Sequence, residues 1–186
     1  MKQDFQTPQK IRQQIWKELG RASQDRHHAW RTPVLATVGV GCAVNARTVV
    51  LRGVDVASQT LQIFTDLRSP KVQEIIDQPM AMFVFWSARL NWQLRVQVCI
   101  MNQTSGSEVE AHWQRVNQTA AAADYLGALA PGSPYPEAFS ACTVPQQTNN
   151  FAVLIAQVSE IDWLKLGRAG HRRARLRQDS WQWLTP

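Results

Sequence analysis

The amino-acid sequence predicts a mainly β protein of the α+β class, in which antiparallel strands form a closed or nearly closed barrel with helices packed outside it. Three observations support this prediction. Roughly eight segments are rich in β-branched and aromatic residues, as strands are. Helical patterns are few and short. Neighbouring strands are joined by short links, which favours antiparallel pairing, and closure of the sheet would protect its edges.

Four segments are typical of helices, and three of them begin at a recognisable signal. Thr7 and Ser69 each precede a proline, which is the pattern of an N-cap followed by the first helical position. Ser107 and Glu110 have the spacing of a capping box. The expected helices run over residues 8–20, 70–77, 107–118 and 120–129.

The strand pattern is clearest in residues 89–98, RLNWQLRVQV, where polar and apolar side chains alternate. This period of two predicts that one face of the strand is buried and that the other meets solvent or a polar ligand. The three residues 57–59 form a hairpin-sized link. The expected strands are residues 34–45, 47–56, 60–65, 80–87, 92–102, 151–158, 160–166, 172–177 and 180–184; residues 130–150 are expected to be mostly irregular.

Length and composition indicate one globular domain. The chain has 186 residues, of which 45% are apolar and 18% are charged. It begins MKQDFQTPQK, without the apolar stretch of a signal peptide, and no apolar run is long enough for a membrane span. Three widely spaced cysteines, without a C-x-x-C pair, argue against a disulfide framework and a zinc site. We therefore expect a cytoplasmic protein without a bound metal.

The charge pattern favours an anionic partner. The formal net charge is +6, and residues 168–177 (RAGHRRARLR) hold five arginines and one histidine. The motifs G-x-G-x-x-G, G-x-x-x-x-G-K-[ST] and H-E-x-x-H are absent from the sequence. The pair His27 and His28 has no ligand-like neighbour apart from Asp25 and is expected in a surface loop.

Four polar clusters could carry chemistry. They are Arg47 with Arg52, residues 64–71 (FTDLRSPK), Gln93 with Arg95, and residues 171–175. In the second cluster, a strand runs into a helix N-terminus that carries a hydroxyl, an arginine and a lysine. Such a helix start favours anions, because its N–H groups are free and its dipole is positive. Each cluster taken alone is also compatible with a solvated surface or a plain helix cap.

Taken together, the clusters resemble the pyridoxamine 5'-phosphate oxidase-like, FMN-binding split-barrel family. The stretches that carry the resemblance are RTVVLRGVD, LQIFTDLRSPK, MAMFVFWSARLNWQLRV and a C-terminal HRRARL followed by W and LTP. Their order and spacing agree with the family pattern along residues 30–186. The resemblance is to the oxidase-related subgroup. It implies an antiparallel six-stranded split β-barrel with flanking helices, a single domain over residues 1–186, and a homodimer with FMN at the subunit interface.

The resemblance also implies which residues bind FMN. Arg47, Ser69 and Lys71 would hold the phosphate, for which cations and N–H donors are suited. The complete set that it assigns to the cofactor is Arg47, Val49, Val50, Leu51, Arg52, Phe64, Thr65, Arg68, Ser69, Lys71, Gln93 and Arg175.

The flavin ring would lie against a different part of this set. Phe64 and Thr65 would line the ribityl chain and the ring, Gln93 would donate to the ring, and Arg175 would lie near its pyrimidine end. The implied substrate contacts are His171 and Arg173. No general acid or base is implied, because the flavin carries the chemistry.

Departures from the family pattern concentrate in the substrate site. Pro70 replaces the arginine before the phosphate-site lysine, although Arg68 could substitute for it. Where true pyridoxamine phosphate oxidases present a tyrosine and an arginine from a helix to the substrate phosphate, this chain has Trp113 and Asn117. The substrate-binding R-x-H reads His171-Arg172-Arg173. The FMN site is thus largely kept, whereas the substrate-phosphate site is altered.

Three functions follow as alternatives. The first is an FMN-dependent oxidoreductase of unknown small-molecule substrate. The second is an authentic pyridoxamine/pyridoxine 5'-phosphate oxidase whose phosphate pocket is rebuilt from Arg115, Arg172 and Arg173. The third is a non-catalytic flavin-binding module, or a nucleic-acid-binding module that uses residues 168–177 and exposed tryptophans.

Overall fold

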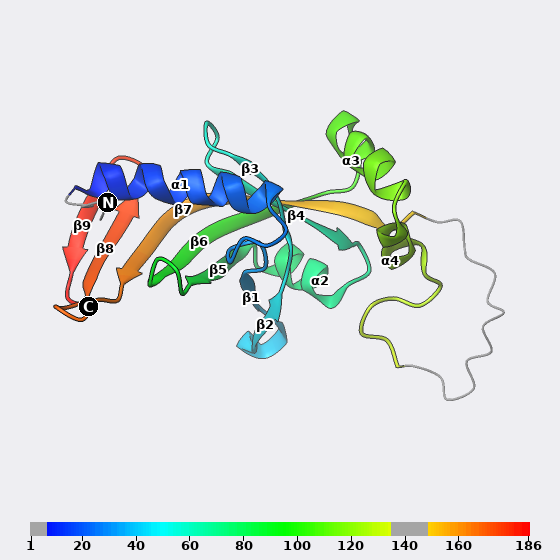
Figure 1. Ribbon diagram of the computed structural model, residues 1–186. Helices are drawn as coiled ribbons and strands as arrows, with labels where there is room; N and C mark the ends of the chain where they lie inside the picture. The colour runs from blue at the N-terminus through cyan, green and yellow to red at the C-terminus, as the bar shows by residue number, and fades with distance from the viewer. Residues whose placement is uncertain (1–6, 135–148) are drawn as a thin grey trace.

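The computed structural model describes residues 7–134 and 149–186, and these contain four α-helices and nine strands (Figure 1). The helices are α1 (Pro8–Gln24), α2 (Pro70–Asp77), α3 (Ser107–Asn117) and α4 (Ala123–Leu126). The strands are β1 (Val34–Val38), β2 (Val44–Thr48), β3 (Leu51–Asp55), β4 (Thr60–Asp66), β5 (Met80–Ser87), β6 (Trp92–Gln103), β7 (Phe151–Lys165), β8 (Arg172–Arg177) and β9 (Trp181–Leu184). Two short 3₁₀ turns, η1 (Val40–Cys42) and η2 (Ala120–Ala122), complete the described elements.

The strands form one antiparallel sheet in the order β2-β1-β5-β6-β7-β4-β3, to which β8 and β9 are added beside β7. The long strand β7 divides the sheet. One of its edges pairs with β6, whereas its other edge pairs with β4 over residues 151–157 and with β8 over residues 160–165. The strands at the two ends of the path, β2 and β3, do not pair with each other in the described chain. The barrel is therefore split, and the predicted fold class is confirmed.

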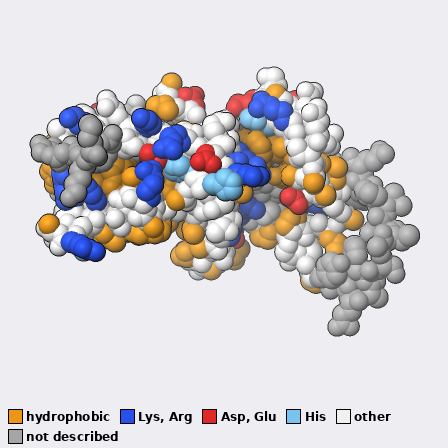
Figure 2. Space-filling model, viewed as in Figure 1, with side chains coloured by type: hydrophobic (Ala, Val, Ile, Leu, Met, Phe, Trp, Pro, Cys, Tyr) orange, Lys and Arg blue, Asp and Glu red, His pale blue; other side chains and the backbone are white. Residues whose placement is uncertain are grey.

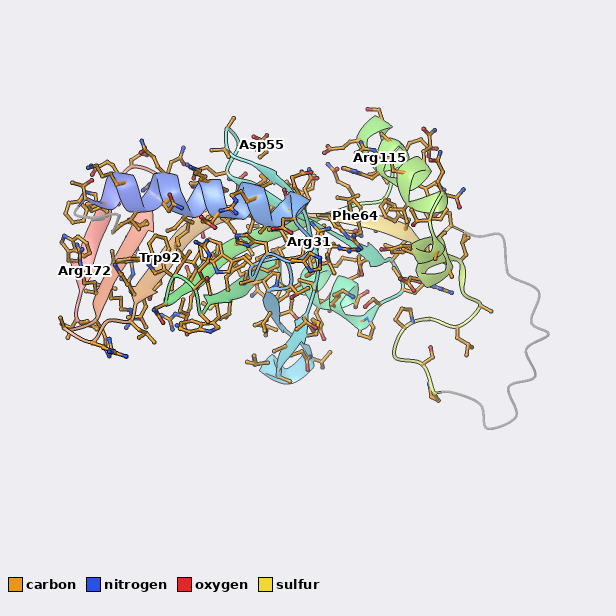
Figure 3. All side chains as sticks on the ribbon, viewed as in Figure 1. Arg31, Asp55, Phe64, Trp92, Arg115 and Arg172 are labelled. Atoms are coloured by element: carbon orange, nitrogen blue, oxygen red, sulfur yellow. The ribbon has the colours of Figure 1, made fainter. Side chains whose placement is uncertain are left out.

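Large aromatic side chains fill one face of the sheet. Trp92 and Trp163 are fully buried on the neighbouring strands β6 and β7, with ring centroids 5.2 Å apart in an edge-to-face arrangement. Helix α1 lies along this part of the sheet (Figures 1 and 3). Its apolar residues recur at helical spacing, so they point to one side and into the core. The fully buried apolar side chains of α1 are Ile11, Ile15, Leu19 and Ala22.

A smaller apolar cluster lies where α3 and α4 cover the far end of β7, at the right of Figure 1. Trp113 of α3 packs against Phe151, with ring centroids 5.6 Å apart, and against Tyr125 at 6.3 Å. Phe151 is also 5.0 Å from the ring of Phe64 on β4. These contacts fix α3 and α4 beside the end of β4, from which α2 begins.

The predicted strand 34–45 is wrong, because the chain turns in its middle. Gly41 and Cys42 have φ of 66° and 64°, and the N–H of Gly39 donates to the carbonyl of Ala43 at 2.7 Å. Glycine adopts such a left-handed conformation without cost. The segment is therefore the hairpin β1–β2 rather than one strand.

The predicted strand 47–56 is also interrupted. The N–H groups of Val49 and Leu51 donate to the carbonyls of Pro33 and Arg31, at 3.0 and 2.9 Å. This pairing with the segment before β1 takes the chain from β2 to β3. Conversely, residues 151–166 were expected as two strands but form the single strand β7. A bulge at Ser159, whose hydroxyl donates to the carbonyl of Gln97, absorbs the irregularity.

The expected helices differ from the observed ones mainly at their ends. Helix α1 continues beyond Gly20 to Gln24, because the Arg31 guanidinium donates to the carbonyls of Ala22 and Ser23 at its C-terminus. Helix α3 has Gly106, not Ser107, as its N-cap. The expected helix 120–129 is shortened to η2 and α4. Residues 135–148 of the expected irregular segment lie outside the described residues.

The expectation that His27 and His28 share a surface loop is wrong for His28. Its Nε2 lies 2.8 Å from a carboxylate oxygen of Glu18, and its Nδ1 accepts from the backbone N–H of Trp30. Glu18 is 2% exposed and also accepts from Gln14, Arg21 and Arg89. The buried Glu18 carboxylate therefore links α1 to the loop before β1 through His28.

Among the described residues, none of the helices has the length and apolar character that crossing a membrane would require.

Candidate cofactor site

The N-terminus of α2 carries the first part of the predicted site. Strand β4 runs into this helix, and Ser69 occupies the N-cap position without using its side chain to cap the helix. Instead, its hydroxyl accepts from the Lys71 ammonium group, with 2.6 Å between Nζ and Oγ. The hydroxyl and the ammonium group therefore face the same point at the helix start.

Arg47 approaches this helix from β2. Its guanidinium donates from Nη2 to Glu74 Oε2 at 2.9 Å and from Nη1 to the hydroxyl of Thr37 on β1. The Glu74 carboxylate also accepts from Thr37 and from Asn45 Nδ2. We call Thr37, Arg47, Ser69, Lys71 and Glu74 the α2 cluster. Arg47 therefore reaches α2 at Glu74, one helical turn after Lys71, and is near enough to Lys71 to repel its ammonium group.

Lys71 is the charged residue of the α2 cluster with the least compensation by an opposite charge. It is half-buried, and within residues 7–134 and 149–186 it forms no ion pair with a carboxylate. Burial, followed by repulsion from Arg47, lowers the pKa of Lys71, and attraction by Asp66 and Glu74 only partly opposes this. By contrast, burial alone would raise the pKa of Glu74, but hydrogen bonds from Thr37 and Arg47 hold it below its ordinary value. The cluster therefore contains a cation that an incoming anion would stabilise.

Arg68, the candidate substitute for the arginine missing at Pro70, is engaged elsewhere. Its Nη2 donates to the buried Asp66 carboxylate at 2.7 Å and to the carbonyl of Gly127 at 2.8 Å. The hydrogen bond to Asp66 raises the pKa of Arg68. The neighbouring Thr65 is buried, and its hydroxyl donates to the backbone carbonyl of Asp66. Arg68 thus fastens the β4–α2 junction to the segment after α4.

Phe64 is the centre of a second group of predicted residues. The Arg52 guanidinium lies 5.6 Å from its ring centroid, and the His112 ring of α3 lies at 4.9 Å (Figure 3 labels Phe64). His112 Nε2 is buried without a hydrogen bond in the described chain, and burial, followed by Arg115, lowers the pKa of His112. Sequence reasoning missed His112, since a single histidine on a helix gave no signal of its position against β4.

Of the three apolar residues of the predicted set, Val49 and Val50 lie between β2 and β3, and Leu51 is the first residue of β3. Leu51 is fully buried in the core, and Val49 packs against the same core. Val50 is half-buried between them. Since Leu51 points inward, only its backbone could face a bound molecule.

The remaining predicted residues share the other face of the sheet. The register places Gln93 of β6 in one row with Leu164 of β7 and Arg173 of β8. The next row contains Arg95, Asp162 and Arg175. The predicted alternation is confirmed for residues 92–98, because Leu94, Val96 and Val98, which alternate with these polar residues along β6, are buried on the opposite face.

Carboxylates neutralise most of the arginines on this face. Asp162 accepts from Nη2 of both Arg95 and Arg173, each at 2.7 Å, and these hydrogen bonds keep its pKa below the ordinary value despite its burial. Arg175 Nε lies 3.1 Å from a Glu160 carboxylate oxygen, but this buried Nε makes no hydrogen bond within the described chain. His171, by contrast, is exposed beyond the start of β8, where its Nδ1 accepts from the N–H of Gly167.

Within one chain the two parts of the predicted site do not meet. Helix α2 lies to the right of centre in Figure 1, whereas β8 and the β5–β6 turn, beside which Gln93 lies, are at the left. The structure therefore joins Arg47, Ser69 and Lys71, and separately aligns Gln93 with Arg173. It does not bring Arg175 or His171 to the α2 cluster.

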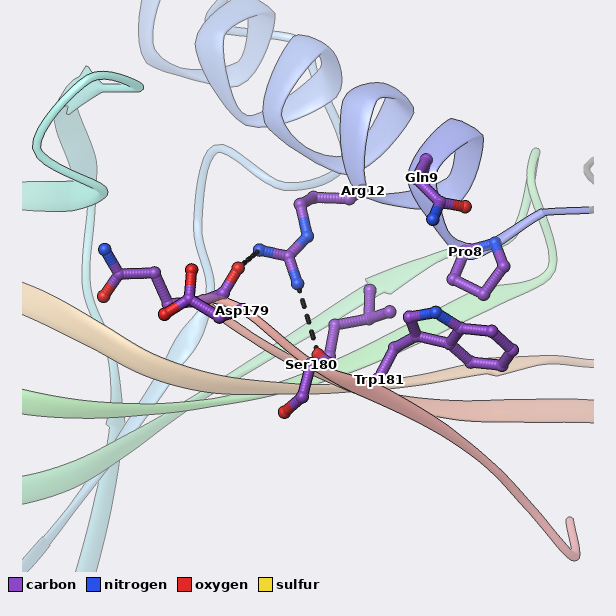
Figure 4. Close-up of a pocket in the computed structure, with 8 residues that line it drawn as sticks. Pro8, Gln9, Arg12, Asp179, Ser180 and Trp181 are labelled. Carbon is purple, nitrogen blue, oxygen red and sulfur yellow. Dashed lines mark hydrogen bonds between the residues drawn. The ribbon is translucent and has the colours of Figure 1, made fainter.

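Two of the hollows in the described chain are lined largely by residues outside the α2 cluster. One, of about 250 Å³, lies between the start of α1 and the β8–β9 turn (Figure 4). Arg12 extends into it and donates to the carbonyls of Gln178 and Ser180, so its polar donors are already used. The other, of about 360 Å³, is mostly apolar and runs over β1 and β5 beside Thr37 and Met82.

The face shown in Figure 2 has no continuous basic stripe. Lys and Arg side chains are scattered over it, with Asp and Glu side chains among them. In residues 168–177, Arg173, Arg175 and Arg177 are paired with carboxylates on β7. This pairing leaves less positive charge for a nucleic-acid backbone than the sequence suggests.

The fold and the α2 cluster together define the class of the protein: a split-barrel protein with cationic side chains where strand β4 enters helix α2. Residues 13–101 match the family model described as "Pyridoxamine 5'-phosphate oxidase, FMN-binding domain". In this segment, which is slightly less than half of the chain, and in its fold, the chain is similar to the pyridoxamine 5'-phosphate oxidase-like, FMN-binding split-barrel family.

Two curated relatives are similar to part of the chain. The pyridoxine/pyridoxamine 5'-phosphate oxidase of Thermosynechococcus vestitus is 39% identical over 80 residues, which are 43% of this chain and 36% of that protein. The pyridoxine/pyridoxamine 5'-phosphate oxidase 2 of Arabidopsis thaliana is 34% identical over 84 residues, or 44% of this chain and 42% of that protein. The matched segments thus span less than half the length of these relatives.

Two solved structures share the fold along almost the whole chain. A pyridoxamine 5'-phosphate oxidase-related, FMN-binding protein from Nostoc punctiforme superposes with a TM-score of 0.72 at 23% identity, covering 97% of this chain and 98% of its own. PhzG from Burkholderia lata, solved in complex with tetrahydrophenazine-1-carboxylic acid, has a TM-score of 0.72 at 16% identity, with 95% and 91% covered. At these identities the likeness establishes the fold.

The residues present fit the phosphate end of FMN. A half-buried lysine without a carboxylate partner among the described residues lies at the start of α2 beside a hydroxyl, with Arg47 nearby, and a phosphate would supply the negative charge that the lysine lacks.

Proposed function

We propose that this chain binds FMN through the α2 cluster and acts as an FMN-dependent oxidoreductase related to pyridoxamine 5'-phosphate oxidase. One observation carries the proposal. Lys71 is a half-buried cation, repelled by Arg47 and hydrogen-bonded to the Ser69 hydroxyl, in a position where the family binds a phosphate. Burying a cation is unfavourable unless a counter-charge is nearby, and a phosphate would supply it.

In this proposal the chain's own residues divide the work. Lys71, Ser69 and Arg47 hold the phosphate, and the β4 residues Phe64 and Thr65 line the path from the phosphate to the ring. Arg52, beside Phe64, adds positive charge along this path. Bound FMN would supply two-electron redox chemistry, which the protein tunes by hydrogen bonds and charges around the ring.

We further propose that a second copy of the chain completes the site. Gln93, Arg173 and Arg175 lie toward the end of the sheet that carries β8, away from α2 (Figure 1), and in this proposal a single chain does not offer both groups to one cofactor. The face on which they lie also exposes apolar side chains: Trp86 is 46% exposed and Met80 is 46% exposed. A homodimer would cover this apolar surface and place Gln93 and Arg175 of one subunit near the α2 cluster of the other.

The substrate is proposed to differ from pyridoxamine 5'-phosphate. Trp113 packs among Phe151 and Tyr125 and is not presented as a phosphate ligand. Arg173 is held by Asp162, and Arg172 stacks over Trp183 with 4.7 Å between the guanidinium carbon and the ring centroid. Two of the three cations that a rebuilt phosphate pocket would need, Arg172 and Arg173, are thus engaged in other contacts. Of the predicted substrate contacts, His171 is kept in this proposal, and the Arg52–His112 region beside Phe64 is added to it.

Flavin titrations test the proposal. FMN and riboflavin would each be added to the protein while flavin fluorescence is followed. We expect FMN to bind much more tightly than riboflavin, and we expect Arg47→Ala to weaken FMN by at least about tenfold without affecting riboflavin. Equal affinities for the two flavins would refute a phosphate site. Incubation of the FMN-loaded protein with pyridoxamine 5'-phosphate should form no pyridoxal 5'-phosphate; turnover would favour the authentic oxidase.

A further inference from the structure

The α2 cluster already contains an anion. The Glu74 carboxylate accepts from three side chains of the β1–β2 hairpin: Asn45 at 2.7 Å, Arg47 at 2.9 Å, and the hydroxyl of Thr37. Its side chain is only 13% exposed. These contacts occupy both carboxylate oxygens, so Glu74 is held in place and not merely near the arginine.

The same contacts use the donors that a phosphate would need. Arg47 directs Nη2 to Glu74 and Nη1 to Thr37, and Thr37 in turn donates to Glu74. Lys71, one helical turn before Glu74 on α2, keeps the Ser69 hydroxyl as its hydrogen-bond partner. Arg47 is therefore committed to a resident carboxylate, whereas Lys71 is not.

The charged groups around Arg47 and the start of α2 come from three elements. They are Arg47 on β2, Lys71 and Glu74 on α2, and Asp66 at the end of β4, which is paired with Arg68. Arg47 is thus paired with Glu74 before any ligand arrives, whereas Lys71 forms no ion pair among the described residues. A phosphate dianion would meet a net charge of about +1 from Arg47, Lys71 and Glu74, and it would be repelled by Glu74 over a few ångströms.

We propose that Glu74 competes with the cofactor phosphate for Arg47 and thereby sets the affinity of this site for FMN. The inference rests on the proposed FMN site. In the free protein, Glu74 takes the place of the phosphate and keeps Arg47 and the β1–β2 hairpin against α2. When the phosphate binds, Arg47 turns from Glu74 toward the ligand, and the cost of this exchange makes FMN weaker and more readily exchanged.

The variant Glu74→Gln tests this inference. It removes the negative charge and keeps a side chain of the same size that still accepts hydrogen bonds. We expect Glu74→Gln to bind FMN at least about tenfold more tightly than the parent chain, because the like-charge repulsion is lost. Riboflavin, which lacks the phosphate, should bind equally to both. Glu74→Ala should change FMN affinity in the same direction and serves if the glutamine variant does not fold.

Asp77→Asn is the matched control. Asp77 lies on the same helix and loses the same charge, but it is exposed and accepts only from Gln73 among the described side chains. It should change the FMN dissociation constant by less than about twofold. Unchanged or weakened FMN binding in Glu74→Gln and Glu74→Ala would overturn the role of Glu74 while leaving the FMN site in place. Absence of FMN binding in the parent chain and in every variant would overturn the proposed function, and the inference with it.

Discussion

Replacing Lys71 by methionine separates two effects of this cation: its cost to the stability of the flavin-free protein and its contribution to FMN binding. The substitution keeps the unbranched stem and removes the charge. In the free protein, burial and Arg47 disfavour the ammonium group, as its lowered pKa shows. A base whose pKa is lowered by folding destabilises the fold while it is charged. This penalty is full below the folded pKa, and it is lost as the pH rises from the folded pKa through the ordinary lysine pKa of 10.5. Lys71→Met should therefore make the flavin-free protein at least as stable as the parent at pH 7.

The same substitution should weaken FMN. A hydrogen bond to a charged partner contributes about 1.5–3 kcal/mol, and two unit charges 4 Å apart interact by about 4 kcal/mol at an effective dielectric constant of about 20. The free protein recovers part of this energy when the buried charge is removed. We therefore expect a loss of about 2–3 kcal/mol, or roughly 30- to 150-fold in the FMN dissociation constant.

Fluorescence titration with FMN and riboflavin gives the dissociation constants, and thermal unfolding without flavin gives the stability. Lys10→Met on the exposed side of α1 is the matched control and should change neither. A Lys71→Met protein that binds FMN like the parent would refute the assignment of Lys71 to the phosphate. A marked loss of stability without flavin would refute the view that Lys71 lacks a sufficient counter-charge.

Two further predictions concern the scaffold. Trp163→Ala should lower the free energy of unfolding by about 3–5 kcal/mol in urea, because it leaves a cavity against Trp92, whereas Trp181→Ala, at a side chain 45% exposed, should cost less than about 1 kcal/mol. Burial alone would raise the pKa of Glu18, but hydrogen bonding to His28 and attraction by nearby arginines lower it below the ordinary 4.5. The ionised Glu18 therefore stabilises the fold above pH 4.5, and this contribution is lost as the pH falls through the folded pKa. Glu18→Gln should therefore destabilise the protein at pH 7 by about 1.5–3 kcal/mol, with a smaller difference from the parent at low pH; a constant difference from pH 3 to pH 7 in urea unfolding would contradict this.

The parts of the fold that the sequence predicts well are those controlled by local pattern. The alternation in residues 89–98 agrees with the burial of Leu94, Val96 and Val98 in the structure, because a strand with one buried face requires apolar residues at every second position. The proline after Ser69 correctly predicts where α2 begins. The hairpin link at residues 57–59 is also found, since β3 and β4 pair on either side of it.

The errors occur where distant contacts override local preference. Residues 34–45 are mostly apolar, so their strand-like composition hides the turn at Gly41. The interruption between β2 and β3 depends on hydrogen bonds to Pro33 and Arg31, which no local pattern reports. Likewise, a strand with a bulge at Ser159 resembles two short strands in sequence.

The site shows the same division. Arg47, Ser69 and Lys71 were found through a motif, but Thr37 and Glu74 were not, because their roles depend on which hairpin lies beside α2. The carboxylate partners of Arg173 and Arg175 depend similarly on the register between β7 and β8. Residues of the motif are therefore predictable from the chain, whereas their counter-charges are known only from the fold.

The absorption spectrum of the purified protein, recorded after FMN is added and again after exhaustive dialysis, tests the central claim most directly. The account predicts flavin absorption bands that remain with the protein after dialysis and that disappear in an Arg47→Ala, Lys71→Met double variant. A folded, colourless parent protein from which all FMN is removed would contradict the claim that the α2 cluster is a cofactor site.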